Sequence, residues 1–399
     1  MKILFLQKRI LFPVDAGWKI RTLNVLKHLA AWHEITYLCN VQQADRPYLE
    51  QMRELGMRLE TVPWRETPRS SPRFYWDLAQ SLLSQDPFTA WKDHDPALRR
   101  RAEQLLEEGD YDLVICDFVQ MARNAMGLPS RASLLFQHNV EAQIYERHAR
   151  NASGWLKRRF MGLQWKKMRR FESEAGKDFD AVVAVSDADR EHFANEYGWA
   201  HAHTIDTAVD THYFHPNGNA EESNRVLFLG SLDWLPNEDG VRFFIEKIWP
   251  AVRQRRPHAS FQIVGRNPSR NVQRFASAPG VELIGTVPDV RPYLASAAVV
   301  VVPLLVGGGT RIKIFEAMAM RKAVVSTSLG AEGLPVRSGE HLVLCDDANA
   351  FAESVVSLLE NDNHRHAIAE NAVQMVRQKY GAETVARQFE SICQEAIRG

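Results

Sequence analysis

Cysteine is scarce in this chain of 399 residues, which contains four. No two of them lie close enough in the sequence to form a CxxC metal or redox motif. A disulfide framework is therefore not expected, and a reducing cytoplasm is the simplest location. The four cysteines are Cys39, Cys116, Cys345 and Cys393.

The chain also lacks long hydrophobic runs and an excess of charge of either sign. No apolar stretch reaches the roughly 18 residues of a membrane-spanning helix. Gln7, Lys8 and Arg9 interrupt the apolar N-terminus too early for a signal-peptide core. Lys plus Arg and Asp plus Glu both total 49. Because there is no overall basic field, we expect no nucleic-acid partner.

Short apolar segments alternate with helical patterns in the first half of the chain. Continuous apolar strands separated by helices indicate a parallel sheet that is covered on both faces. A helix is expected over residues 20–31, where Ile20, Leu23, Leu26 and Ala30 share one face. The expected strands are residues 2–6, 34–39, 113–117, 133–137 and 181–185.

The same alternation restarts near residue 210, after a polar segment at about 206–222. The sequence therefore predicts an α/β protein with two Rossmann-like, doubly wound domains, residues 1–208 and 209–384. A last helix, residues 385–399, could pack back onto the first domain. Ligands of such sheets bind beyond the carboxyl ends of the strands. The expected strands of the second domain are residues 226–229, 260–264, 281–283, 299–302, 323–326 and 342–344.

A glycine-rich loop is the most informative local feature of the sequence. The strand ending at Pro303 is followed by Gly307, Gly308 and Gly309, and Thr310 is a good N-cap for the next helix. Glycines let the backbone approach a ligand closely, and the free amides of a helix start favour a phosphate. The alternative is an ordinary glycine-rich turn. Neither a Walker A motif nor a GxGxxG fingerprint is present.

Two cations, Arg311 and Lys313, occupy the first turn of that helix. Cations at a helix N-terminus oppose the helix dipole. Their presence is explained if an anionic diphosphate neutralises them. Solvated surface cations are the alternative.

The segment GGGTRIKIFEAMA, residues 307–319, resembles the donor-binding signature of family 4 glycosyltransferases. The resemblance implies the GT-B fold, with two Rossmann-like domains facing each other across a cleft. It also implies retaining transfer of a sugar from a nucleotide diphosphate sugar, and it is nearest to a branch associated with exopolysaccharide clusters. Further matching segments, in the order of the family, are residues 13–21, 137–141, 185–190, 209–214 and 228–231.

The resemblance assigns the donor side of the site. Glu316 matches the second glutamate of the EX7E pattern, which binds the ribose hydroxyls; an ion pair with Lys313 is the alternative. The first glutamate is replaced by Gly308, and Ser231 stands where an arginine is usual. We therefore expect Arg311 and Lys313 to neutralise the diphosphate.

Backbone groups complete the expected donor site. Gly17 lies in the first loop and would allow close approach of the diphosphate, with a plain turn glycine as the alternative. Gly265 and Val287 lie in loops that follow strands of the second domain. In the family, such loops hold the base largely through backbone groups. The glycines Gly308 and Gly309, with Thr310, complete this set.

The remaining candidates lie in the first domain. His138 directly follows a strand, so we expect it at the edge of the cleft, where the resemblance implies a contact with the donor sugar. An ordinary loop histidine is the alternative. Asp117 ends its strand and is expected to face the acceptor. Arg21 either reaches the cleft or is a solvated helix residue. Asn139 and Glu141 either bind the acceptor or cap the next helix.

A basic segment at residues 155–171 carries a separate signal. If it is helical, Arg158, Arg159, Lys166, Arg169 and Arg170 fall on one arc of about 120°. Such a helix can bind an anionic membrane surface, and a core-packed helix with a solvated basic face is the alternative. The apolar residues Leu156, Phe160, Met161, Leu163, Trp165 and Met168 are expected largely on the other side.

Taken together, the sequence predicts a glycosyltransferase that needs no cofactor. Its partners are a nucleotide-sugar donor and a glycan or lipid-linked acceptor, and its location is cytoplasmic, with possible peripheral attachment to the inner membrane face. The family resemblance implies a reaction without a metal ion, so no metal is expected. The alternatives are a sugar-nucleotide epimerase, a phosphorylase, or a nucleotide-sugar-binding protein without turnover, which the missing first glutamate motivates.

Overall fold

A computed structural model describes residues 1–399 except 15, 69–70, 151–153, 217, 219–220 and 307–311. The chain divides into two compact units. The N-terminal unit comprises Met1–Asp206 and Val385–Gly399, and the C-terminal unit comprises Thr207–Thr384. The expected boundary at residues 208 and 209 differs from this division by two residues.

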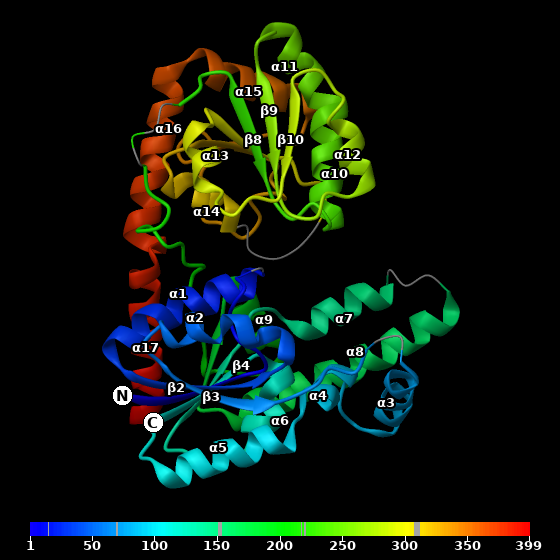
Figure 1. Ribbon diagram of the computed structural model, residues 1–399, viewed down its shortest axis with the longest axis vertical. Coiled ribbons are helices and arrows are strands. Elements are labelled where there is room, and N and C mark those ends of the chain that lie inside the picture. The colour runs from blue at the N-terminus through cyan, green and yellow to red at the C-terminus, as the bar shows by residue number, and fades with distance from the viewer. Residues whose placement is uncertain (15, 69–70, 151–153, 217, 219–220, 307–311) are drawn as a thin grey trace. The chain divides into compact units, whose positions relative to one another are not determined.

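The N-terminal unit is built on a parallel sheet with helices on both of its sides, such as α1 and α5 (Figure 1). Among the described residues the sheet has seven strands in the order β3-β2-β1-β4-β5-β6-β7. The strands are β1 (Lys2–Gln7), β2 (Glu34–Val41), β3 (Arg58–Pro63), β4 (Leu113–Asp117), β5 (Ser133–Phe136), β6 (Ala181–Ala184) and β7 (Ala202–Thr204). The helices are α1 (Gly17–Trp32), α2 (Leu49–Arg53), α3 (Pro72–Leu83), α4 (Phe88–Asp93), α5 (Pro96–Glu108), α6 (Ala122–Ala125), α7 (Glu141–Arg150), α8 (Trp155–Ala175) and α9 (Asp187–Tyr197).

The C-terminal unit repeats this plan. Its described residues form a parallel sheet of six strands in the order β10-β9-β8-β11-β12-β13. The strands are β8 (Arg225–Leu229), β9 (Ser260–Val264), β10 (Val281–Gly285), β11 (Val299–Val302), β12 (Ala323–Ser326) and β13 (Val343–Leu344). The helices are α10 (Leu235–Phe243), α11 (Trp249–Arg255), α12 (Arg270–Phe275), α13 (Arg291–Ser296), α14 (Ile312–Ala319), α15 (Ala348–Glu360) and α16 (Asp362–Met375).

Two parallel sheets in two units confirm the predicted α/β, doubly wound architecture. In each sheet the strand order reverses direction beside the first strand, between β1 and β4 and between β8 and β11. This reversal is the topological switch point, where the loops diverge and leave room for a ligand. Each unit therefore has one favoured place for a site.

The strands that the sequence did not predict lie at or near the sheet edges. β3 and β7 are the two edge strands of the N-terminal sheet. β3 is largely polar and only one of its residues, Val62, is buried, whereas β7 has three partly exposed residues. A strand that is not buried on both faces has no continuous apolar run, which removes the signal used for the central strands.

The C-terminal helix α17 (Ala382–Arg398) supplies part of the N-terminal core. The ring of Phe389 packs on Phe136 of β5, with 5.1 Å between centroids. Glu390 pairs with His33 at 2.8 Å between oxygen and Nε2. From residue 385 onward, the last helix therefore belongs to the N-terminal unit although it follows the C-terminal unit in sequence.

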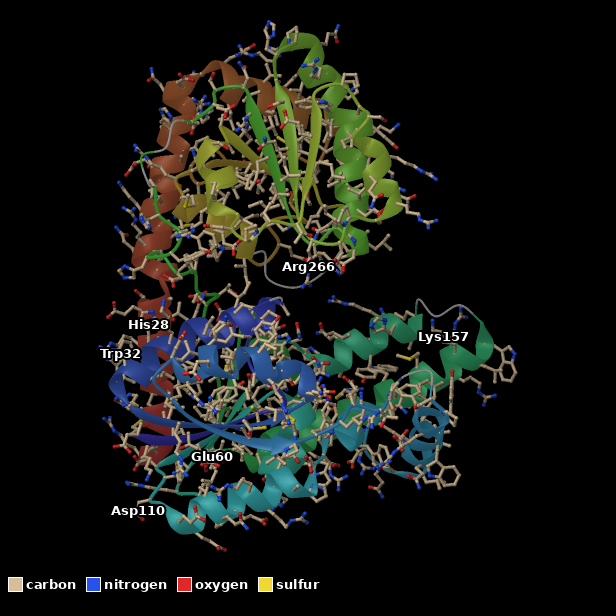
Figure 2. All side chains as sticks on the ribbon, in the orientation of Figure 1. His28, Trp32, Glu60, Asp110, Lys157 and Arg266 are labelled. Carbon is tan, nitrogen blue, oxygen red and sulfur yellow. The ribbon has the colours of Figure 1, made fainter. Side chains whose placement is uncertain are left out.

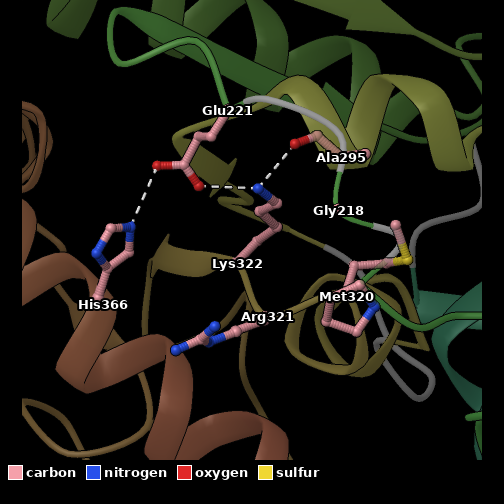
Figure 3. Close-up of a pocket in the computed structure, with 8 residues that line it drawn as sticks. Gly218, Glu221, Ala295, Met320, Arg321, Lys322 and His366 are labelled. Atoms are coloured by element: carbon pink, nitrogen blue, oxygen red, sulfur yellow. Dashed lines mark hydrogen bonds and ion pairs between the residues drawn. The ribbon is translucent and has the colours of Figure 1, made fainter.

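Glu221 lies in the polar segment that follows the boundary between the units, and it ties this segment to the rest of the C-terminal unit (Figure 3). Its carboxylate accepts hydrogen bonds from Lys322 Nζ at 2.8 Å and from Arg365 Nε at 2.9 Å. Lys322 also donates to the carbonyl oxygen of Ala295 at 2.8 Å, and His366 Nε2 lies 3.7 Å from Glu221. Glu221, Ala295, Lys322 and His366 line a pocket, and its main charges thus satisfy one another. None of the residues lining this pocket belongs to the expected site.

A buried carboxylate, Glu172 of α8, organises the N-terminal unit next to β5. It accepts hydrogen bonds from the backbone amides of Glu141 and Ala142, the first two residues of α7, at 2.9 and 3.1 Å. Gln137 Nε2 and the Tyr197 hydroxyl donate to the same carboxylate at 3.2 and 2.9 Å. Burial nevertheless dominates and raises the pKa of Glu172 to about 8.

This pKa predicts a pH dependence of stability. Between the ordinary glutamate value near 4.5 and the folded value of about 8, the folded protein holds a proton that the unfolded chain has lost. The free energy of unfolding should therefore fall as the pH rises through this window, by up to about 1.4 kcal/mol per pH unit. Glu172→Gln removes the titration, so urea unfolding curves of this variant should lack that fall.

Glu174→Gln is the matched control, because Glu174 lies on the same helix but is exposed. That variant should keep the wild-type pH dependence. Parallel pH profiles for the wild type and Glu172→Gln would contradict the assignment of the proton to Glu172.

Candidate functional site

The first cluster of candidate residues lies at the switch point of the N-terminal sheet. Asp117 is the last residue of β4, His138 follows β5 by two residues, and Arg21 lies on α1. His138 Nε2 is 2.6 Å from Asp117 Oδ1, and Arg21 Nη1 is 3.0 Å from His138 Nδ1. Strand ends and a helix thus bring together three residues that are far apart in the sequence.

The hydrogen bonds define the state of the histidine. A guanidinium can only donate, so His138 Nδ1 accepts from Arg21 and Nε2 carries the proton that is donated to Asp117. Burial lowers the pKa of His138, with Asp117 opposing and the Arg21 charge adding to this shift. His138 is therefore a neutral imidazole that is held from both sides. Burial also lowers the pKa of Arg21, to about 10, which leaves Arg21 charged at neutral pH.

Two further side chains, which the sequence did not single out as site residues, complete this cluster. Gln7 ends β1, and its Nε2 donates to Asp117 Oδ2 at 2.6 Å. The Thr22 hydroxyl donates to the same oxygen at 3.1 Å. Gln7 ends the strand beside β4, so the rule that sites lie at strand ends would have found it. Thr22 carries no comparable signal, because its position depends on how α1 packs on the sheet.

The burial of three candidates was not predicted from the sequence. His138 is 3% exposed, Asp117 is 0% exposed and Arg21 is 5% exposed. The alternatives of an ordinary loop histidine at His138 and of a solvated helix residue at Arg21 are therefore wrong. The Asp117 carboxylate is hydrogen-bonded to His138, Gln7 and Thr22. The reason is mutual pairing, since most polar atoms of these side chains are hydrogen-bonded to one another or to neighbouring side chains, which lowers the cost of burial.

Aromatic rings close over this cluster. The rings of Phe118 and Phe136 each lie 4.4 Å from the His138 ring, measured between centroids. Phe118 directly follows β4 and has a φ of 75°, a left-handed conformation that is rare for a bulky residue. Backbone strain of this kind persists where the surrounding structure imposes it, often at functional sites. Trp18 of α1 packs edge-on against Phe118 at 5.4 Å.

The other candidates of the N-terminal unit, Asn139, Glu141 and Gly17, do not belong to the hydrogen-bonded cluster around His138. Asn139 is partly exposed, and its Nδ2 lies 3.5 Å from Glu141 Oε1. Glu141 is buried, which raises its pKa and leaves little of it for an acceptor. The expected capping role of Asn139 or Glu141 is also wrong, because the carboxylate of Glu172 caps α7. Gly17 is exposed and is the first residue of α1.

A second cluster lies at the switch point of the C-terminal sheet. Lys313 of α14 donates from Nζ to Asn237 Oδ1 at 2.8 Å, and its ammonium lies 4.7 Å from the centre of the Phe228 ring. A Cβ atom at Gly230, which follows β8, would approach Lys313 Nζ and Asn237 Nδ2 to 2.7 Å. A larger residue here would have to displace the ends of these two side chains, so Lys313 lies directly against the strand end. The sequence predicted Lys313 but gave no role to Asn237 or Gly230.

Arg266 supplies a cation that the sequence analysis did not predict. It follows Gly265 at the end of β9 (Figure 2). Its Nε donates to the Ser231 hydroxyl at 2.9 Å. Ser231 is the position where the family resemblance leads one to expect an arginine. A Cβ at Gly265 would lie 1.8 Å from the Gly230 carbonyl oxygen, so this glycine allows the ends of β8 and β9 to touch. An arginine from the neighbouring strand thereby reaches the place of the missing side chain.

Glu316 lies one turn after Lys313 on α14 and is partly buried. Within the described residues its carboxylate forms no hydrogen bond or ion pair, so the alternative of an ion pair with Lys313 is wrong. Burial raises the pKa of Glu316 to about 7, with the charge of Lys313 opposing. A carboxylate left without protein donors can accept hydrogen bonds from a ligand.

Four expected donor residues, Gly308, Gly309, Thr310 and Arg311, lie outside the described residues. Val287 is partly buried, and its side chain packs on the core of the C-terminal unit. Only its backbone is therefore left for the expected contact with the nucleotide base. Among the described residues, no group of three or more His, Cys, Asp and Glu side chains is arranged to hold a metal ion.

The basic segment is helical, as expected, but its apolar residues are divided differently. Met168 is buried, whereas Leu156 and Leu163 are 66% and 40% exposed and therefore belong to the outward side. The exposed basic residues, Arg158, Arg159, Lys166, Arg169 and Arg170, lie on α8 as predicted. No described helix is both long and apolar enough to cross a membrane.

Two family models match the chain. The model for glycosyl transferases group 1 matches residues 223–361, and the model for Glycosyltransferase Family 4 matches residues 85–213. Together they cover about two thirds of the chain. The first match contains the Lys313 cluster and the second contains Asp117 and His138.

Individual relatives extend the comparison over the whole chain. An uncharacterized 44.6 kDa protein in the cps region of Klebsiella pneumoniae is 24% identical over 99% of both chains. A phosphatidyl-myo-inositol mannosyltransferase of Mycolicibacterium smegmatis is 27% identical over 74% of both chains. Among solved structures, Anabaena HepE in complex with UDP and glucose has a TM-score of 0.66, with 16% identity and 98% of both chains covered. Together with the two parallel sheets, these matches show that the chain is a glycosyltransferase, a member of the GT-B enzymes with group 1 and family 4 domains.

Proposed function

We propose that this enzyme moves a sugar from a nucleotide diphosphate sugar to an acceptor hydroxyl, with retention of the anomeric configuration and without a metal ion. The observation that carries the proposal is the group formed by Lys313, Arg266 and Glu316 around the end of β8. It combines two cations, which suit a diphosphate, with a carboxylate, which suits ribose hydroxyls.

The cations account for the chemistry of the leaving group. Negative charge builds on the diphosphate oxygens as the glycosidic bond breaks. Fixed cations and amides aimed at that charge stabilise the transition state more than the ground state. We assign this role to Lys313 and Arg266, together with Arg311 as inferred from the sequence. Because the protein supplies these charges, no divalent ion is required.

His138 is proposed to serve the sugar end of the donor. Its unprotonated Nδ1 is a hydrogen-bond acceptor, which Arg21 Nη1 occupies at a distance of 3.0 Å. If the charged guanidinium of Arg21 turns toward substrate, Nδ1 becomes available for a sugar hydroxyl, while Asp117 holds the ring in the same tautomer. Asn139, which is partly exposed, is the best placed of the remaining candidates to meet the acceptor.

We further propose an acceptor that is a glycan or a lipid-linked intermediate of cell-surface polysaccharide synthesis. The names of two relatives support this, one encoded in a cps region and one acting as a phosphatidyl-myo-inositol mannosyltransferase. A cytoplasmic enzyme attached peripherally to the inner membrane face fits such an acceptor. The exposed basic residues of α8 support this location.

The reaction can be tested with a panel of nucleotide sugars and polyprenyl-linked or glycan acceptors. Mass spectrometry should detect nucleoside diphosphate release that depends on an acceptor and persists in EDTA, and NMR of the product should show a retained anomer. Binding of nucleotide sugars without consumption of any, with every acceptor class, would favour a binding protein. Loss of activity in EDTA that magnesium or manganese restores would contradict the metal-free site.

Lys313→Ala and Arg266→Ala should each weaken binding of nucleoside diphosphates at least tenfold, about 1.4 kcal/mol, because each removes a cation facing the diphosphate. Isothermal titration calorimetry measures this directly. Arg274→Ala is the control, since Arg274 is an exposed arginine on nearby α12 and should be neutral. Unchanged affinity in both test variants would remove these residues from the donor site.

His138→Ala should leave nucleoside diphosphate affinity nearly unchanged but lower kcat on the order of a hundredfold, about 2.7 kcal/mol. Thr22→Val is the control, because it removes a hydrogen bond to the same Asp117 and leaves the imidazole in place. Both variants should be assayed at a temperature where unfolding curves show them folded. Equal turnover in the two variants would mean that His138 has only a structural role.

A further inference from the structure

Helix α3 exposes the side that amphipathic helices normally bury. Tyr75, Trp76, Leu82 and Leu83 are 62%, 64%, 45% and 91% exposed. With Ala79 they recur at three- and four-residue intervals and cover an arc of about 120° on the outer side of the helix. We call these five residues the apolar stripe. Scattered exposed hydrophobic side chains are common, but a continuous exposed stripe indicates an interaction surface.

The orientation of α3 is fixed from its inner side. The ring of Phe74 packs edge-on against Phe88 of α4, with 5.5 Å between centroids. Lys167 of α8 donates from Nζ to the carbonyl oxygens of Ser81, Leu82 and Ser84 at 2.7, 3.2 and 2.7 Å. These bonds satisfy carbonyl groups at the end of α3 that lack helical partners. The stripe therefore faces outward because the opposite face is already used.

Apolar side chains of α8 continue this surface. Trp155 and Leu156 at its start are both 66% exposed, and Leu163 is 40% exposed. Leu156, Leu163 and Lys167 are spaced by seven and four residues, so they share one face of α8. Because Lys167 reaches the end of α3, this face of α8 runs toward the apolar stripe. Figure 2 labels Lys157 in this first turn of α8.

The same region carries unbalanced positive charge. Between residues 155 and 170 there is no acidic side chain. Lys157, Arg158, Arg159 and Lys166 are exposed, and none of them has an ion-pair partner among the described residues. An apolar surface with Trp and Tyr side chains beside unpaired cations complements a bilayer interface, which offers apolar chains beneath anionic head groups.

We propose that the apolar stripe of α3 and the first half of α8 form one membrane-docking face, which inserts into the interface of bilayers that contain anionic lipids. The stripe enters the acyl boundary, and the cations of α8 bind the head groups. This deepens the proposed function and rests on it in one respect, since a lipid-linked acceptor gives the docking its purpose. The attachment itself needs no turnover, so it can be measured independently.

The test is co-sedimentation of the full chain with phosphatidylcholine vesicles that contain or lack phosphatidylglycerol. Trp76→Ser combined with Leu83→Ser should lower the partition coefficient at least tenfold on vesicles with phosphatidylglycerol. Gln80→Ser, on the polar side of the same helix, should change it less than twofold. Both substituted positions of the test variant are exposed, so the fold should be retained.

A second variant separates charge from insertion. Lys157→Gln, Arg159→Gln and Lys166→Gln together should remove the preference for phosphatidylglycerol and most of the sensitivity to salt. Brominated lipids should quench tryptophan fluorescence in the wild type and in this charge variant when each is fully vesicle-bound. The quenching should be weaker in Trp76→Ser.

The outcomes are decisive in both directions. Equal vesicle binding by the wild type and the stripe variant, or no binding by the wild type at low salt, would overturn the proposal. A wild-type dimer in sedimentation velocity that Leu83→Ser dissociates would assign the stripe to a second copy of the chain instead. Transfer to a water-soluble acceptor should be unaffected in every variant, so failure of the sugar-transfer proposal would appear in that assay and leave the vesicle result standing.

Discussion

The burial of parallel strands on both faces is the constraint on which the rest of this structure depends. Strands such as β4 and β11 are buried along their whole length, so their side chains must be apolar. Polar chemistry is therefore confined to the points where strands end. The two clusters in this enzyme, one around Asp117 and one around Lys313, lie at such points in their respective sheets.

The two clusters solve the same electrostatic problem in opposite ways. Around His138, both ring nitrogens have partners within the protein, so the imidazole can be buried and held in one tautomer. Around Glu316, the carboxylate has no hydrogen-bond donor among the described residues, whereas two cations, Lys313 and Arg266, lie near the end of β8. An internally satisfied network positions groups, whereas an unsatisfied and charged one invites a ligand. This division suits the proposed transfer, in which one cluster binds the diphosphate and the other orients the sugar.

The sequence predicted the central strands and the residues at their ends, because continuous apolar runs and the polar residue after them are local signals. It did not predict that His138 and Asp117 are buried, because their burial depends on Arg21, which is distant in sequence. Arg266 was missed for a similar reason, since only the pairing of β8 and β9 brings it to Ser231. The stripe of α3 shows a further limit: a periodic pattern identifies an apolar side, but not whether that side faces the core.

The chain leaves the N-terminal unit after Asp206 and returns to it at Val385. The N-terminal unit is therefore discontinuous in sequence, and its last helix is made only after the whole C-terminal unit. A fragment that ends at Asp206 lacks the packing of Phe389 on Phe136 and the ion pair of Glu390 with His33. During synthesis the first sheet must consequently wait, with part of its core open, until translation of the second unit is complete. In this sense the C-terminal unit is an insertion, and the order of the domains along the gene is not the order in which they can be finished.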